Sequence, residues 1–115
     1  MKYRIKWPLY KYTPLRKLKK HNIWYKVMEF NGEIGWIQKK HVNNDHLCAI
    51  VKVNHTTLRK HPSKRKRKKN NTPEPKALYS DTFKVLEITK NRKWARVENE
   101  KGQQYWIERK MVWIY

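Results

Sequence analysis

An internal repeat constrains the fold more than any other feature of the 115-residue chain. The sequence matches itself without a gap at a spacing of 70 residues, so that Trp24 corresponds to Trp94 and Trp36 to Trp106. The same spacing relates Val27 to Val97, Gly32 to Gly102, Ile37 to Ile107, Lys40 to Lys110 and Val42 to Val112. Such a match indicates one supersecondary unit used twice, in a chain long enough for one ordinary domain or two very small ones.

Each copy has the pattern of a β-hairpin. In the first copy, residues 24–30 partly alternate between apolar and polar side chains and are followed by Asn31-Gly32. That dipeptide is a strong signal for a two-residue hairpin turn. Residues 34–37 then form the return strand, and residues 93–98 and 104–107 repeat the hairpin in the second copy.

Shorter elements flank each hairpin. We expect an extended run before it, a single 3₁₀ turn after it and a final short strand. In the first copy these are residues 14–18, 38–41 and 48–53, and in the second copy residues 83–88, 108–110 and 112–115. The sequence therefore predicts an all-β protein of two small tandem barrels, with the first repeat in residues 1–48 and the second in residues 49–115.

The charge of the chain points to an anionic partner. Lys and Arg number 29 against 9 Asp and Glu, which gives a formal net charge of +20. A small body with this charge repels itself, so we expect it to bind nucleic acid, an acidic polymer, a membrane surface or an acidic protein. A basic surface that only keeps the protein soluble is the alternative.

Two basic stretches are the candidate anion-binding sites. One is Lys64–Lys69, within residues 63–76, which we expect to form an exposed, mobile loop. The other is residues 16–21, on a strand and turn. The candidate residues are Arg16, Lys17, Lys19, Lys20, Arg59, Lys60, Lys64, Arg65, Lys66, Arg67, Lys68 and Lys69. The alternatives are a solvated loop and an edge strand kept charged against aggregation.

Aromatic residues are abundant, with six Trp and seven Tyr. We expect the repeated tryptophans, at positions 24, 36, 94 and 106, to be core or half-buried residues of the barrels. Tyr10, Tyr12, Tyr25 and Tyr105 are the candidates for exposed, ligand-binding rings, since bases and peptides stack on aromatic surfaces flanked by cations. Sequence alone does not separate this use from packing.

Catalytic and metal-binding patterns are absent from the sequence. The single cysteine, Cys48, and the five histidines do not form paired metal-ligand spacings, and no phosphate-binding glycine loop or nucleophile motif occurs. No run of 18 apolar residues is present, so no transmembrane helix is expected. We therefore predict no enzymatic activity, no cofactor and no metal.

The pattern resembles bacterial SH3-like domains, in particular the tandem type in small exported proteins of alphaproteobacteria. In the first copy the resembling residues are Tyr3, Ile5-Lys6-Trp7, Pro14-Leu15, Trp24, Lys26-Val27, Gly32 and Gly35-Trp36-Ile37. In the second copy they are Leu58-Arg59, Pro62-Ser63, Trp94, Val97, Gly102, Trp106-Ile107 and Trp113. The resemblance implies SH3-like barrels that act as binding or targeting modules for cell-wall peptides or protein partners, without catalysis.

The first copy departs from this family because it lacks an opening strand. The counterpart of residues 57–63 would lie before Met1. Either upstream residues are absent, or a partner supplies the strand, or the first barrel stays open at an edge that can accept another chain. The run Lys64–Lys69 is also foreign to the family's pattern.

Three functions remain open from the sequence. The first is a module that binds a peptide, cell-wall or protein ligand through barrel loops and exposed aromatic rings. The second is a basic RNA-binding or ribosome-associated structural protein, and the third is a subunit of a larger assembly. The compartment stays unknown, because the chain shows no signal peptide, whereas related modules are often exported and would carry one upstream of Met1.

Overall fold

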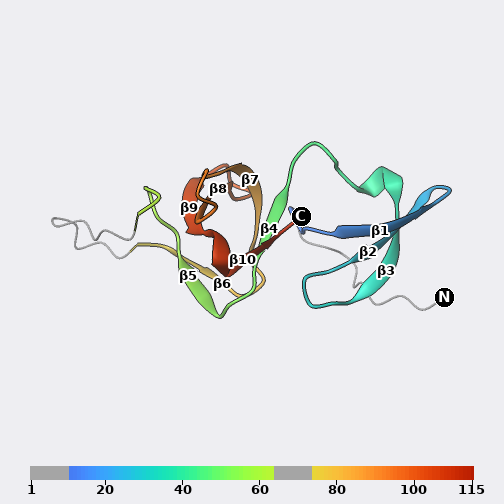
Figure 1. Ribbon diagram of the computed structural model, residues 1–115, viewed down its shortest axis with the longest axis horizontal. Coiled ribbons are helices and arrows are strands. Elements are labelled where there is room, and N and C mark those ends of the chain that lie inside the picture. The colour runs from blue at the N-terminus through green and yellow to red at the C-terminus, as the bar shows by residue number, and fades with distance from the viewer. Residues whose placement is uncertain (1–10, 64–73) are drawn as a thin grey trace.

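The computed structural model describes residues 11–63 and 74–115, and it has the all-β fold that the sequence predicts (Figure 1). The strands are β1 Arg16–His21, β2 Trp24–Met28, β3 Ile34–Gln38, β4 Cys48–Val51, β5 His55–Thr57, β6 Lys76–Leu78, β7 Thr82–Ile88, β8 Trp94–Glu98, β9 Gln104–Glu108 and β10 Val112–Ile114. Two 3₁₀ turns, η1 Lys39–His41 and η2 Arg109–Met111, follow β3 and β9, close to where we expected them. Within the described residues, no helix is long and apolar enough to cross a membrane.

The first half of the molecule, residues 11–47, is an open antiparallel sheet. Its strands lie in the order β1-β2-β3, and β1 carries a bulge between Lys17 and Lys19. Every residue of β1 is exposed, whereas Val27 in β2 and Ile37 in β3 are buried. Within the described residues, no further strand pairs with β1 or β3.

The second half, residues 48–115, contains a curved five-stranded sheet in the order β10-β4-β7-β8-β9 and a separate β5-β6 ribbon. Arg59 links the two, because its amide donates to the carbonyl of Trp106 at 2.9 Å and its carbonyl accepts from the Trp106 amide at 2.7 Å. The main apolar core lies inside this closed arrangement and contains Ala49, Val51, Leu58, Ala77, Phe83, Val85, Ala95, Val97, Ile107, Val112 and Ile114. The second half therefore provides most of the buried apolar surface.

The repeat is reproduced in the backbone. The amide of Glu29 donates to the carbonyl of Glu33 at 2.8 Å, and the equivalent bond from Asn99 to Gln103 is 3.0 Å long. The first residues of η1 and η2 are anchored in the same way, to the carbonyls of Ile23 and Lys93, at 2.8 and 2.9 Å. The identical bonds support the interpretation of one unit used twice.

The hairpin turn is one residue longer than the expected Asn31-Gly32 turn. Because Glu29 and Glu33 still pair through the backbone, three residues, Phe30 to Gly32, form the loop. Gly32 has φ +87°, and Gly102 in the second copy has φ +81°. A glycine in this left-handed conformation at the third position is typical of three-residue hairpin loops. The expected two-residue turn was therefore wrong.

Strand β4 lies in a different place from the one we expected. The sequence predicted residues 48–53 as the closing strand of the first copy, but β4 pairs with β10 and β7 of the second half. Ala49, Ile50 and Val51 are all buried. A strand with apolar side chains on both faces needs cover on both sides. The second half provides that cover, and the open first sheet does not.

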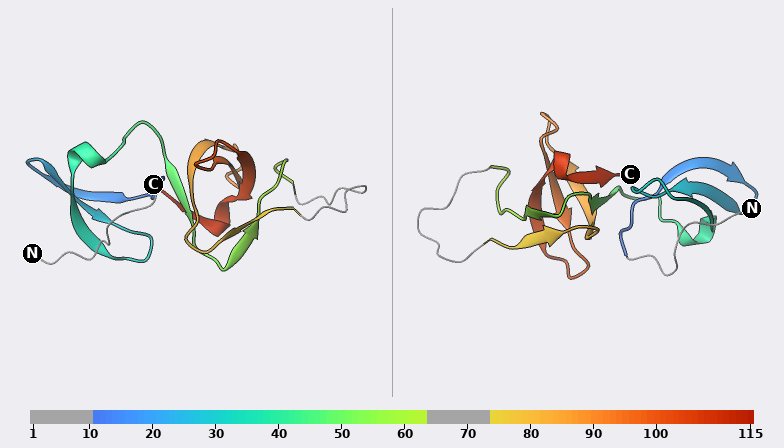
Figure 2. Two further views of the ribbon diagram at one scale, coloured as in Figure 1. Left: turned by 180° about the vertical axis from the view of Figure 1, so that it is seen from behind. Right: turned by 90° about the horizontal axis from the view of Figure 1, so that it is seen from below.

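The two halves lie side by side along the long axis of an elongated molecule of 55 × 26 × 23 Å (Figure 2). Besides the backbone bond from the Val85 amide to the Leu47 carbonyl at 2.9 Å, several side-chain contacts connect them. The hydroxyl of Thr82 donates to the carbonyl of Lys11 at 2.6 Å, the rings of Phe30 and Tyr79 lie 5.6 Å apart, and the guanidinium of Arg16 lies 5.7 Å from the ring of Tyr115. These contacts place β1 next to the junction between the halves.

Candidate functional site

A basic and aromatic surface covers one side of the first sheet. Paired residues of neighbouring strands share a face, and the register pairs Lys19 with Lys26 and Lys26 with Trp36. His21 joins them, with its ring 6.3 Å from that of Trp36 in an edge-to-face arrangement. We call the side of the sheet that carries Arg16, Lys19, His21, Trp24, Lys26 and Trp36 the outer face.

The second half carries an ion pair at the corresponding place. Arg96 corresponds to Lys26, and its strand partner Glu87 corresponds to Lys19. The Nε atom of Arg96 donates to Oε1 of Glu87 at 2.7 Å, and Nη1 of the same arginine donates to Gln104 at 2.9 Å. The first copy therefore has a second cation where the second copy has a carboxylate.

Lys19 and Lys26 have no carboxylate partner among the described residues. Like charges on directly opposite residues of neighbouring strands destabilise a sheet. An anion bound between the two amines would remove this repulsion. The outer face is thus an electrostatic site that lacks its counter-charge, beside the half-buried ring of Trp36, on which a ligand can stack.

The opposite side, the inner face, carries Lys17, Lys20, Tyr25, Val27 and Ile37. The amines of Lys17 and Lys39 lie 5.0 and 5.4 Å from the centre of the Tyr25 ring, within cation–π range. In the second half the residues that correspond to Lys17 and Tyr25 are Val85 and Ala95, both buried in the core. The inner face of the first sheet is therefore basic where the second is apolar.

The structure places the tyrosine candidates differently from the expectation of exposed rings. Tyr12, Tyr25 and Tyr105 are all half-buried, which corrects that expectation, and Tyr105 packs against the core of the second half. Tyr12 stacks edge-on against His46 at 5.8 Å. Tyr10 lies outside the described residues. Of the four, Tyr12 and Tyr25 lie among cations in the first half.

The basic candidates from Arg59 onward do not share one role. Arg59 closes the second half, and its guanidinium lies 3.4 Å from Glu74 with a side chain only 17% exposed. This arginine therefore has a structural role, whereas Lys60 is exposed. Lys64–Lys69 lie outside the described residues. Lys76, expected at the end of the loop, instead begins β6 and pairs with Thr57.

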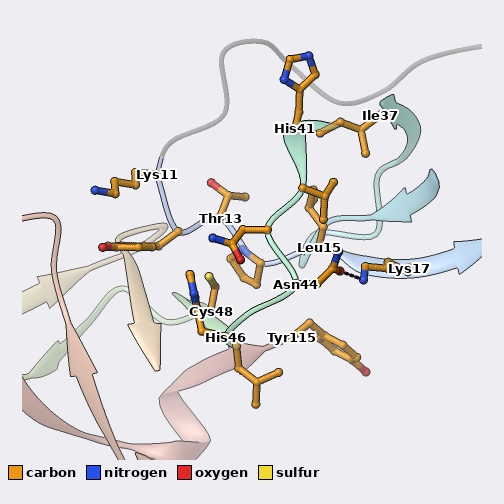
Figure 3. Close-up of a pocket in the computed structure, with 15 residues that line it drawn as sticks. Lys11, Thr13, Leu15, Lys17, Ile37, His41, Asn44, His46, Cys48 and Tyr115 are labelled. Atoms are coloured by element: carbon orange, nitrogen blue, oxygen red, sulfur yellow. Dashed lines mark hydrogen bonds between the residues drawn. The ribbon is translucent and has the colours of Figure 1, made fainter. Parts of the chain in front are cut away.

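A pocket of about 510 Å³ lies where the two halves meet (Figure 3). Its walls come from the segment before β1, from β1, β3 and η1, from the connection between η1 and β4, from Cys48 at the start of β4, and from Tyr115. Lys11 and Lys17 lie on opposite sides of it, and the amine of Lys17 donates to the side-chain oxygen of Asn44. Sequence reasoning missed this pocket, because its walls are far apart in the chain.

Cys48 lines the pocket, and burial raises the pKa of its thiol to about 11, although the positive charge of Lys84 acts in the opposite direction. The thiol is therefore protonated and weakly nucleophilic at neutral pH. No cluster of potential metal ligands occurs among residues 11–63 and 74–115.

The antiparallel strand order and the paired hairpins with their 3₁₀ turns are those of an SH3-like β protein. The model of the GW (Gly-Tryp) dipeptide domain matches residues 15–43 and 49–112. The chain belongs to this family of bacterial SH3-like binding modules. The Gly-Trp dipeptide is present as Gly35-Trp36 in β3, whereas β9 has Tyr105-Trp106. No curated protein matches the chain significantly.

Proposed function

We propose that the chain is a non-enzymatic binding module whose outer face holds an anionic polymer of the cell wall. One observation carries this proposal: Lys19 lies opposite Lys26 at the position where the second copy has the Glu87–Arg96 ion pair. The family to which the chain belongs, which is of the cell-wall-binding type, supports a wall ligand. RNA has no such support.

In this proposal the two repeats, in residues 1–48 and 49–115, have different tasks. The second repeat is the stable, closed unit with the larger core. The first is the open sheet that carries ligand-binding cations on β1 and β2, with Trp36 beside them. Tyr12 and Tyr25 on the inner side of the sheet are the remaining aromatic candidates. Protein ligands with acidic surfaces would be recognised by the same chemistry.

Binding to purified cell walls tests the proposal. We expect the chain to sediment with walls and to be released as salt rises from about 50 to about 200 mM, because polyanion binding depends on counterion release. Walls whose anionic polymers have been removed should not retain it. A single-stranded RNA of equal charge is the competitor. Soluble wall polymer is the reference competitor. If RNA releases the chain from walls at a lower concentration of negative charge than soluble wall polymer does, the RNA-associated function is correct instead.

A matched pair of variants locates the site. Lys19→Ser with Lys26→Ser should weaken wall binding roughly tenfold, since exposed ion pairs contribute up to about 1 kcal/mol each. Lys52→Ser with Lys90→Ser removes the same charge from exposed positions of the second half, and it should change binding by less than about threefold. Equal losses in both variants would mean that net charge, rather than the outer face, retains the polymer.

A further inference from the structure

The pocket at the junction is separate from the outer face. Lys17 lines it from β1 and Ile37 from β3, and both side chains belong to the inner face of the first sheet. Successive residues of a strand point to opposite sides of the sheet, so Ile37 and Trp36 face away from each other. A ligand in the pocket would therefore bind independently of a polymer on the outer face.

The pocket exists because the two copies differ at the inner face. In the second copy, Val85 fills the position of Lys17, and the strands β4 and β10 complete the core around it. In the first copy, the lysine brings a charge and its amine bonds to Asn44. A side chain with a charged end does not close a dry core. About 510 Å³ of space remains open between the halves, within the range of roughly 300–1,000 Å³ typical of small-molecule sites.

The side chains around this space combine an apolar base with basic groups. Leu15 and Ile37 supply apolar walls, Lys11 and Lys17 supply the positive charges, and the imidazoles of His41 and His46 also line the pocket. None of the lining side chains is a carboxylate. Figure 3 shows Lys11 and Lys17 flanking the pocket on opposite sides, with Leu15 between them. Such a site favours a ligand that carries a negative charge on an apolar body.

We propose that this pocket binds a small carboxylate with an apolar body, with Lys17 as the carboxylate-binding residue. Two sources share this chemistry, the C-terminal residue of a peptide and a short acyl carboxylate. The proposal goes beyond the polymer binding of the outer face and does not depend on it. The pocket would give the module a second, smaller ligand beside its polymer.

Titration of the ¹⁵N-labelled chain with acetyl-Ala-Ala-Leu and with octanoate tests the proposal. At least one carboxylate should shift the backbone amide signals of Asn44 and Cys48 in a saturable way, and the titration that does so identifies the source. The peptide amide and octanol, which lack the charge, should bind at least about fivefold more weakly. The titration extends to about 10 mM ligand, which corresponds to roughly the weakest affinity that the proposal allows. If neither carboxylate shifts these signals up to that concentration, or if the neutral analogues bind equally well, the proposal is wrong.

Three variants place the ligand. Lys17→Gln should weaken carboxylate binding at least about fivefold, and Val42→Trp, which puts a large side chain into the pocket wall, should abolish it. Lys40→Gln removes a charge from an exposed residue outside the pocket and should leave the affinity within about twofold. Unchanged affinity in Lys17→Gln would overturn the role of Lys17, and unchanged affinity in Val42→Trp would overturn the site.

Discussion

Exchanging Lys19→Glu together with Lys26→Arg should abolish most of the polymer binding while leaving the fold intact. The double variant gives the first sheet the same cross-strand ion pair that Arg96 and Glu87 form in the second, at 2.7 Å. It removes the repulsion between like charges, and such cross-strand pairs contribute roughly 0.2–1 kcal/mol. We therefore expect unchanged or slightly increased stability.

Binding should respond in the opposite direction. The variant pairs the cation at position 26 internally and adds a carboxylate that repels the polymer. If each lost or repulsive interaction contributes up to about 1 kcal/mol, affinity should fall by about 2–3 kcal/mol, or roughly 30- to 150-fold. Sedimentation with cell walls measures the loss, and a urea melt provides the stability control. Retained binding in a folded variant would exclude the outer face as the site.

The second large effect is a loss of folding stability that should differ between equivalent substitutions in the two copies. Ile107→Ala removes a side chain with 0% exposure from the core of the second half. Loss of such a side chain costs about 2–5 kcal/mol, because it removes buried contacts and leaves a cavity. A domain of this size has a total stability of only about 5–15 kcal/mol. The variant should therefore unfold at a markedly lower denaturant concentration.

Ile37→Ala is the matched control at the same position of the first copy. Ile37 is 4% exposed but lines the pocket, so its surroundings are already open on one side. Truncation there extends an existing space rather than creating a new cavity, and we expect a loss of about 1–2 kcal/mol. Urea melts followed by tryptophan fluorescence compare the two variants. Equal losses would contradict the assignment of the main core to the second half.

Much of the fold could be predicted because the repeat and the hairpin signals are local. The match of Trp24 with Trp94 and of Trp36 with Trp106 identified β2, β3, β8 and β9, and the 3₁₀ turns followed from the same spacing. The partner of β4 could not be predicted in this way. Its position depends on which half can cover both of its faces, and that is a property of the assembled core.

The outer face was only partly predicted, for a reason that lies in the hairpin between the first two strands of each copy. Lys19 was a candidate, whereas Lys26 and Trp36 were not considered as ligand-binding residues. The connection from β1 to β2 has two residues, and the equivalent connection from β7 to β8 is longer, with Thr89 bonded to Trp94 across it. An alignment without gaps therefore pairs Glu87 with Lys17 instead of Lys19. Only the strand register shows that Lys19 and Lys26 occupy the positions of the Glu87–Arg96 ion pair.

The central claim is that the outer face of the first sheet binds the polymer, and mapping amide chemical shifts during a titration with short-chain polyphosphate tests it most directly. The account predicts the largest changes in β1, β2 and β3, at Lys19, Lys26 and Trp36, together with the indole signal of Trp36. Changes should be small in β7, β8 and β9, where Arg96 is already paired. Changes confined to the second half, or to the basic run Lys64–Lys69, would contradict the claim.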